Sequence, residues 1–217
     1  MERQQQSIVR WAPFEIVPFL QSAFDSLLTL LNEPDTSGSS YMPPANRLLL
    51  VGMALSMRAK DILELGYSTG RTTLALALTG ANVVAVDNHF EDSREMEAVK
   101  TLLSGAHHVT FVREDALLYL IGLPAESVDL VFLDDCHWPA YTALECIQLQ
   151  RILRPGGVAA FHDVLASHLI ETISAAFPLP WEIFQLPSIQ GWAGYSGDAE
   201  LIDRDFGLGF ARKPHHG

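Results

Sequence analysis

Short runs of apolar, often β-branched residues alternate with helical stretches from about residue 60 onward, and this alternation constrains the fold more than any other feature. The runs are ILELG (62–66), VVAVD (83–87), VTFVRED (109–115), VDLVFLDD (128–135) and GGVAAFHDV (156–164). Continuous apolar runs separated by segments with helical spacing indicate parallel strands that are covered by helices on both faces. The sequence therefore predicts a doubly wound α/β fold.

The pattern changes after Pro178, where two strand-like segments follow with no clear helix between them, WEIFQLP (181–187) and FGLGFARK (206–213). We expect them to complete a mostly parallel, seven-stranded, Rossmann-like sheet with an antiparallel edge strand. The Gly-rich segment that joins them is long enough to be a functional loop. Helical patterns near the N-terminus predict a helical extension or lid over residues 1–58, followed by the main domain over 59–217.

Composition and charge exclude several classes of partner. The chain has 217 residues, 48% of them apolar, and a formal net charge of -12 with no Lys/Arg run. A chain this acidic is a poor match for nucleic acid or for an anionic membrane surface. The polar N-terminus has no signal-peptide pattern, and no apolar run approaches membrane length. Because Cys136 and Cys146 form no disulfide framework, we expect a reducing, cytoplasmic location.

The first apolar run ends in a turn, ELGYSTG, that is suited to a ligand. Gly66 and Gly70 allow the backbone to turn tightly and to approach a bound molecule closely. The helix that follows points its first amide groups at this position, beyond the carboxyl end of a parallel strand. About 20 residues further on, Asp87 ends the next run, where a carboxylate can bind both hydroxyls of a ribose. These features predict a cofactor that contains a nucleoside.

The same turn argues against a nicotinamide dinucleotide. The dinucleotide fingerprint is G-x-G-x-x-G, whereas this turn is G-x-x-x-G followed by Arg71. Glu64 would also repel a pyrophosphate, but it suits a cationic ligand such as S-adenosylmethionine (SAM), which carries an ammonium and a sulfonium. The alternative is that Glu64 only ends a strand and that the two glycines serve the turn alone.

These motifs, in this order, resemble class I SAM-dependent methyltransferases. The resemblance rests on E-x-G-x-x-x-G, on Asp87, on "EDAL" after the third run and on "LRPGG" before the fifth. "ELGYSTGRT" is closer to metal-dependent O-methyltransferases of the catechol and caffeoyl-CoA type. "FLDDCHWPAYTAL" and "GGVAAFHDV" resemble bacterial natural-product and sugar O-methyltransferases, which pair an Asp-x-x-His-x-x-Tyr stretch with a strand that ends in His-Asp.

The resemblance implies a set of site residues. The donor-binding residues would be Met42, Glu64, Gly66, Tyr67, Ser68, Gly70, Thr72, Asp87, Asn88, Asp115, Ala116 and Asp134. For Asp115, an ordinary helix N-cap is the alternative. Asp134 and Asp163 would hold a divalent cation such as Mg²⁺, but Val164 stands where the family has its third oxygen ligand. His162, Asp135 or His137 could compensate, since imidazole and carboxylate both bind divalent metals.

The implied activity is methyl transfer from SAM to a hydroxyl of a small molecule. Asp134 and His137 are the candidate catalytic residues, with His137 in the position of the family's basic Lys. An imidazole can accept a hydroxyl proton near neutral pH. Trp138, Trp192 and Tyr195 could form an apolar wall for the acceptor.

Two other readings stay open. One is a non-catalytic scaffold that retains the donor fold or acts as a dimer partner. The other is an enzyme resembling the aminopropyltransferases, which use decarboxylated SAM. A homodimer is compatible with either reading and with the methyltransferase itself.

Overall fold

The computed structural model describes residues 42, 44–88, 94–164, 169–185 and 207–215. The predicted helical extension therefore lies mostly outside the described residues, as do the Gly-rich segment, Trp192 and Tyr195. The described helices are α2 (Pro44–Ser56), α3 (Arg71–Ala77), α4 (Arg94–Leu102), α5 (Ala116–Gly122), α6 (Pro139–Ile152) and α7 (Leu169–Ala176). The strands are β1 (Asp61–Leu65), β2 (Asn82–Val86), β3 (Val109–Val112), β4 (Val128–Leu133), β5 (Leu153–His162), β6 (Glu182–Gln185) and β7 (Leu208–Arg212).

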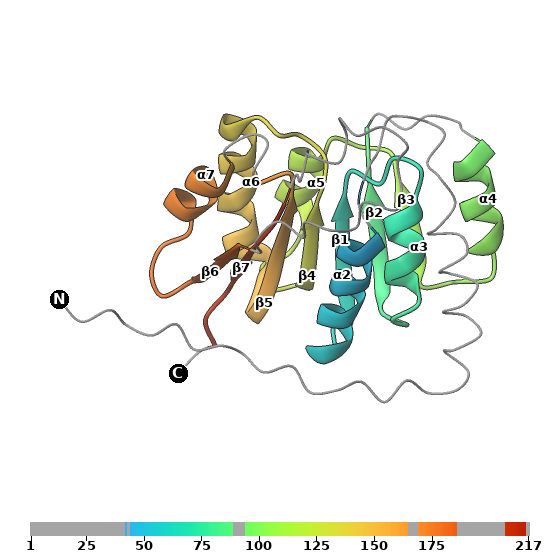
Figure 1. The fold of residues 1–217 in the computed structure, drawn as a ribbon, viewed down its shortest axis with the longest axis horizontal. Coiled ribbons are helices and arrows are strands. Elements are labelled where there is room, and N and C mark those ends of the chain that lie inside the picture. The colour runs from blue at the N-terminus through green and yellow to red at the C-terminus, as the bar shows by residue number, and fades with distance from the viewer. Residues whose placement is uncertain (1–41, 43, 89–93, 165–168, 186–206, 216–217) are drawn as a thin grey trace. The chain divides into compact units, whose positions relative to one another are not determined.

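The strands form one seven-stranded sheet in the order β3-β2-β1-β4-β5-β7-β6 (Figure 1). The pairs from β3 through β5 are all parallel, and β7 runs antiparallel to both β5 and β6. The predicted fold class is confirmed. The antiparallel strand lies one position in from the edge of the sheet, between β5 and β6.

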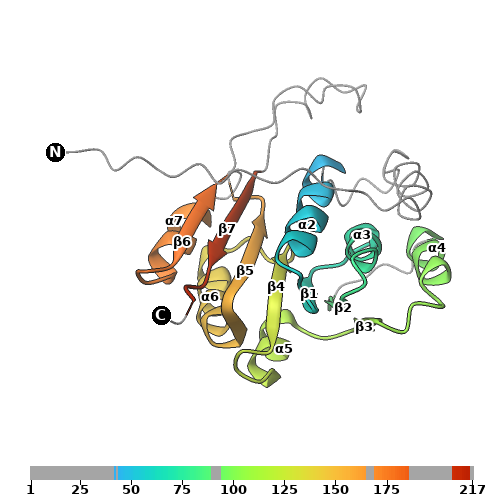
Figure 2. The same ribbon diagram turned by 90° about the horizontal axis from the view of Figure 1, so that it is seen from below.

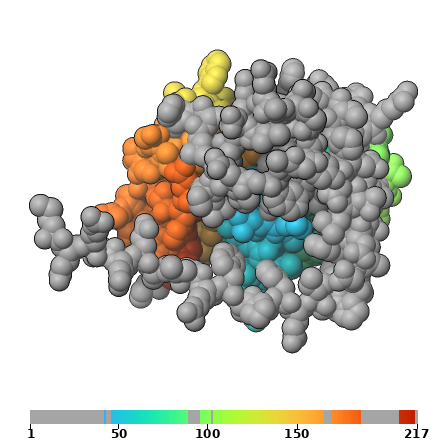
Figure 3. All heavy atoms as spheres, viewed as in Figure 1, coloured from blue at the N-terminus to red at the C-terminus, as the bar shows by residue number. Residues whose placement is uncertain are grey.

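Helices cover both faces of this sheet, and each face has its own apolar core. α2 and α3 pack on one face, where Leu50 and Leu76 join buried residues of the central strands such as Phe132. α5, α6 and α7 pack on the other face with residues such as Leu149 and Phe161. Figure 2 shows α2, α3 and α4 on the side of the sheet opposite to α5. The outer side of α2 lies at the molecular surface (Figure 3).

Strand β5 begins earlier than the sequence predicts. The expected strand was 156–164, because Pro-Gly-Gly after a helix normally marks a turn. In the structure α6 ends at Ile152 and β5 starts at Leu153. Leu153 pairs with Val128 of β4, and a register shift follows in this pair of strands before Leu130. This irregularity lets the strand pass through the Pro-Gly-Gly segment without a break in the sheet.

The carboxyl ends of the central strands meet along one edge of the sheet. Leu65 of β1 pairs with Val86 of β2 on one side and with Leu133 of β4 on the other. Leu133 in turn pairs with Phe161 of β5. The residues that follow these positions are therefore neighbours, although they are far apart in the sequence.

Candidate methyl donor and acceptor site

The turn after β1 passes directly over the end of β4. Gly66 has φ +84° and its amide donates to the carbonyl of Val86 at 2.8 Å. A Cβ atom at Gly66 would lie 2.3 Å from the carbonyl oxygen of Asp134. Gly70 has φ +80° and is the N-cap of α3. Glycine is thus required at residue 66 both for the backbone conformation and for the close approach of the two chain segments.

Replacing Gly66 with alanine should therefore destabilise the protein by about 3 kcal/mol or more, from left-handed backbone strain together with steric overlap. Gly80→Ala is the matched control, because Gly80 also has a positive φ but a Cβ there would meet nothing within 4 Å. That control should cost only about 1 kcal/mol. Urea unfolding of both variants measures the difference, and equal losses would show that the overlap at residue 66 is unimportant.

Glu64 is buried in the central strand, with only 1% of its surface exposed. The hydroxyl of Thr73 donates to its Oε2 at 2.5 Å. Burial, helped by the negative charges of Asp134 and Asp87, raises the pKa of Glu64 to about 8, against the opposing effects of the Thr73 hydrogen bond and of Arg47. A buried carboxyl group directly before the glycine turn is suited to a positively charged ligand.

Arg47 is a residue of this region that the sequence reasoning missed. It is 3% exposed, and its Nε donates to the Thr72 hydroxyl at 3.4 Å. Thr72 in turn donates to Sδ of Met42 at 3.6 Å. These contacts join the start of α2 to the first turn of α3, so two predicted donor-binding residues, Met42 and Thr72, lie together. The only sequence signal was a single Arg within the apolar helix ANRLLL.

Asp87 lies at the end of β2, and one of its carboxylate oxygens accepts the Ser68 amide at 2.9 Å. Ser68 has φ +43°, a conformation that is uncommon outside glycine. Tyr67 is buried and packs edge-on against Phe111, with ring centroids 5.2 Å apart, whereas Asn88 is exposed. The structure therefore brings the turn and Asp87 together and leaves Asn88 at the surface beside them.

Asp115 is the N-cap of α5, which was the alternative to a cofactor contact. Its Oδ1 accepts the Leu118 amide at 3.1 Å, and its Oδ2 accepts the Tyr141 hydroxyl at 3.2 Å. The same hydroxyl accepts the Leu117 amide. Ala116 is buried in the first turn of this helix. Both oxygens of Asp115 thus have partners within the protein that fix the start of α5.

Two carboxylates and two imidazoles meet where β4 and β5 end. Nδ1 of His162 lies 3.0 Å from Oδ1 of Asp134 and 3.0 Å from Oδ1 of Asp163. Nε2 of His137 lies 2.9 Å from Oδ2 of Asp163 and 3.8 Å from Asp134. Asp163 has φ +57°, a strained conformation of the kind found at functional sites. The predicted residues Asp134, His137 and Asp163 are therefore in contact.

The charges of this cluster perturb one another strongly. The hydrogen bond to Asp163 raises the pKa of His137 above its ordinary value. Burial alone would lower the pKa of His162, but the charge of Asp134 and the hydrogen bonds to both aspartates raise it to about 10. Burial alone would raise the pKa of Asp163, yet the hydrogen bonds from His137 and His162 lower it to about 2. The Asp163 carboxylate is thus ionised and suited to accept a proton donor or a cation.

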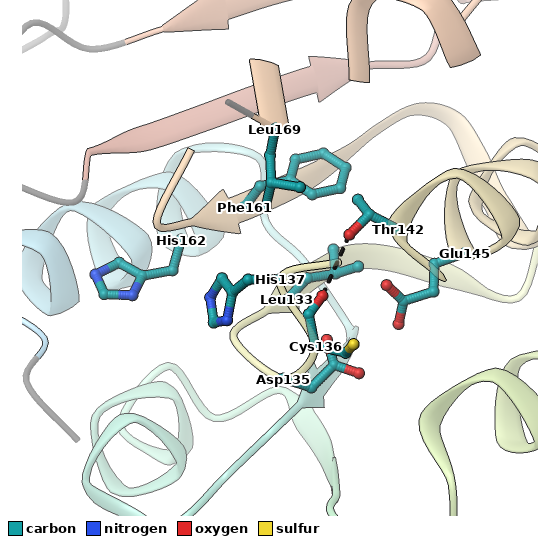
Figure 4. Close-up of a pocket in the computed structure, with 9 residues that line it drawn as sticks. All are labelled: Leu133, Asp135, Cys136, His137, Thr142, Glu145, Phe161, His162 and Leu169. Carbon is teal, nitrogen blue, oxygen red and sulfur yellow. Dashed lines mark hydrogen bonds between the residues drawn. The ribbon is translucent and has the colours of Figure 1, made fainter. Parts of the chain in front are cut away.

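A small pocket adjoins this cluster, between the ends of β4 and β5 and the first turns of α6 (Figure 4). The Thr142 hydroxyl donates to the Cys136 carbonyl at 3.2 Å. Glu145 of α6 is fully buried beside Asp135, and burial together with the Asp135 charge raises the pKa of Glu145 to about 10. Burial and the neighbouring charge therefore favour the protonated form of Glu145.

The donor set fits a divalent cation. Asp134, His162 and Asp163 each offer one ligand atom, and these atoms lie within 4.8 Å of one another. Val164, at the position of the expected third oxygen ligand, is fully buried in the apolar core beneath α6 and α7. A cation here would therefore be bound by two carboxylates and an imidazole.

Among the described residues, no helix combines the length and the apolar character that crossing a membrane requires.

The sheet order and the glycine turn define the class I methyltransferase fold, and comparison with known proteins agrees. Residues 63–164, a little under half of the chain, match the family model described as a methyltransferase domain. This segment is therefore similar to a methyltransferase domain, and the predicted resemblance to class I SAM-dependent methyltransferases is confirmed. No curated protein is significantly similar to the chain in sequence.

Solved structures share the fold at low sequence identity. The O-methyltransferase TomG from Streptomyces achromogenes, involved in tomaymycin synthesis and solved with SAM, is 18% identical, with a TM-score of 0.61 over 90% of this chain and 96% of its own. A Bacillus cereus O-methyltransferase solved with S-adenosylhomocysteine (SAH) is 20% identical, with a TM-score of 0.56 over 88% and 90%. A Corynebacterium glutamicum protein reaches 0.67 over 92% and 97% at 16% identity.

Proposed function

We propose that this protein transfers the methyl group of SAM to a hydroxyl of a small molecule. The observation that carries the proposal is the juxtaposition of two features at one edge of the sheet. Glu64 and Asp87 flank the glycine turn, and the His137–Asp163 pair lies where the next strands end. The first feature suits a cationic nucleoside, and the second suits removal of a proton.

On the donor side, Glu64 would bind the ammonium of SAM and Asp87 would accept the ribose hydroxyls. The burial of Glu64 supports this assignment, since an ammonium would compensate a carboxylate that is costly to ionise alone. The Asp87 carboxylate lies against the same turn, because its Oδ2 accepts the Ser68 amide. TomG and the Bacillus cereus enzyme, which share the fold, were solved with SAM and SAH.

On the acceptor side, His137 would act as the general base. Asp163 accepts the Nε2 proton of His137, which leaves Nδ1 with the lone pair that can take the acceptor's proton. The acceptor oxygen then forms its bond to the methyl carbon as the carbon–sulfur bond breaks. The electron pair of that bond returns to sulfur, the sulfonium becomes the neutral thioether of SAH, and the proton remains on His137.

A divalent cation would be held by Asp134, Asp163 and His162. When bound, such an ion lowers the pKa of a coordinated hydroxyl and orients its oxygen. The protein's own residues keep the remaining tasks, which are to bind the donor, to hold the acceptor and to remove the proton.

The acceptor that fits this account is a small hydroxylated molecule with an apolar part. Trp138 directly follows His137 and is 77% exposed, so its ring is available to an acceptor at the edge of the site. The scaffold alternative predicts a degraded site, whereas Glu64, Asp87, Asp134 and His137 are present together. A homodimer stays a prediction.

Calorimetric titration with SAM, on the unaltered chain and on Asp87→Asn, tests the donor half of the proposal. The unaltered chain should bind SAM, and the variant should bind it about 10- to 100-fold more weakly, because a charged hydrogen-bond partner of the ribose is lost. Glu97→Gln removes a charge from the exposed Glu97–Lys100 pair and is the control for net charge. Absence of SAM binding by the unaltered chain would overturn the proposal.

A further inference from the structure

The spacing of Asp134, His162 and Asp163 matches that of ligands around a single metal ion. In octahedral coordination, neighbouring ligand atoms at about 2.1 Å from the ion lie about 3 Å apart. Nδ1 of His162 lies 3.0 Å from one oxygen of each aspartate. The imidazole nitrogen therefore lies at the spacing of neighbouring ligands from both carboxylates, and the three ligand atoms all lie within 4.8 Å of one another.

The backbone holds the imidazole rigidly in this position. His162 is the last residue of β5 and pairs with Leu208 of β7, and its side chain is 3% exposed. The ring also lies near Phe132, with centroids 6.5 Å apart. His162 is therefore a buried member of the cluster, fixed by the sheet, and not a surface side chain near it.

The two oxygens of Asp163 serve different partners. Oδ1 faces His162, whereas Oδ2 accepts His137 at 2.9 Å. An ion between Asp134, His162 and Asp163 would leave the His137–Asp163 hydrogen bond in place, where it supports and orients the carboxylate. Binding a cation and removing a proton are thus compatible within one cluster.

We propose that this site is selective for a first-row transition metal, such as Mn²⁺, Fe²⁺, Co²⁺ or Zn²⁺, with His162 as a direct ligand. This inference rests on the proposed function, because it identifies the ion that the same site would bind. Imidazole nitrogen suits these metals, whereas Mg²⁺ requires oxygen ligands. The expected amide or carboxylate after Asp163 is replaced by the buried Val164, so the nitrogen of His162 is the third donor that the described residues offer.

His162→Asn tests the assignment, because it replaces the nitrogen donor with an amide oxygen of similar reach. Titration of the full chain with Co²⁺, followed by visible absorption, and with Mg²⁺, followed by calorimetry, should be carried out without SAM or acceptor. We expect Co²⁺ affinity to fall by about 10- to 100-fold or more in the variant, since loss of even an outer-shell partner of a metal ligand typically costs about that much. Mg²⁺ affinity should change by less than about threefold, since magnesium gains little from nitrogen. His107→Asn, at an exposed histidine, controls for adventitious imidazole binding.

Pulsed electron paramagnetic resonance of the Mn²⁺-loaded, unaltered chain gives a second readout that does not depend on the variant's stability. It should detect coupling of the ion to a ¹⁴N nucleus, and the coupling should be lost in folded His162→Asn. Equal Co²⁺ affinity of the two chains, or Mn²⁺ bound without nitrogen coupling, would overturn the inference. A chain that binds the metal but not SAM would instead contradict the proposed function alone.

Discussion

Glu64→Gln is expected to weaken SAM binding by about 100-fold or more, while making the empty protein more stable at neutral pH. The affinity falls because the donor's ammonium loses a buried, oppositely charged partner, a loss of about 3 kcal/mol. Glutamine keeps the size of the side chain and can still accept the Thr73 hydroxyl. The binding loss is measured by calorimetry, with the exposed Glu97→Gln as the control.

The stability gained by replacing Glu64 with glutamine should increase as the pH rises. The pKa of Glu64 is about 8 in the folded protein, above its ordinary value of 4.5. The native state therefore holds a proton that the unfolded state has lost between these values, and stability falls as pH rises through this window. Glu64→Gln should match the unaltered chain near pH 4.5 and exceed it by a few kcal/mol near pH 8. Urea unfolding across this range measures it, and parallel profiles would mean that Glu64 is not buried as described.

His137→Gln should lower the rate of methyl transfer by about 100- to 10,000-fold, the usual contribution of a general base. Glutamine retains a donor for Asp163 but cannot accept a proton. SAM affinity should change by less than about threefold, because a group that acts only in the transition state leaves ground-state binding unaffected. Single-turnover transfer from labelled SAM separates the two quantities, with His107→Gln as the control.

The pH dependence of the methyl-transfer rate tests the same role of His137. A base must be unprotonated, and the hydrogen bond to Asp163 raises the pKa of His137 above 6.5. The transfer rate should therefore rise with pH and level off above neutrality, whereas the residual rate of His137→Gln should lack this rise. An unchanged profile in the variant would assign the proton to another group.

Much of the fold was predictable because each buried strand is a continuous apolar run and each run ends in a residue with its own chemistry. Asp87, Asp134 and Asp163 could be placed at one edge from their positions after these runs, since parallel strands share the direction of their ends. The start of β5 was predicted incorrectly, because Pro155 and two glycines indicate a turn locally. Only the pairing with β4 shows that the strand continues through them.

The burial of two ionisable side chains could not be predicted from the sequence. Arg47 and Glu145 each lie within a helical pattern, where a lone charge normally faces solvent. In the structure Arg47 packs against Thr72, and Glu145 is enclosed beside Asp135. Which atoms of His162 and Asp163 face each other depends on backbone angles that no residue pattern specifies. The helical extension and the Gly-rich segment remain predictions.

Methyl transfer to a hydroxyl can be measured directly. The full chain would be incubated with SAM carrying a ¹³C-labelled methyl group and a panel of phenols, catechols and sugar alcohols, with and without added divalent metal. We expect a labelled O-methyl product, seen by nuclear magnetic resonance at an O–CH₃ shift, together with one equivalent of SAH. A label on nitrogen or carbon, or bound SAM with no transfer to any hydroxyl, would contradict it.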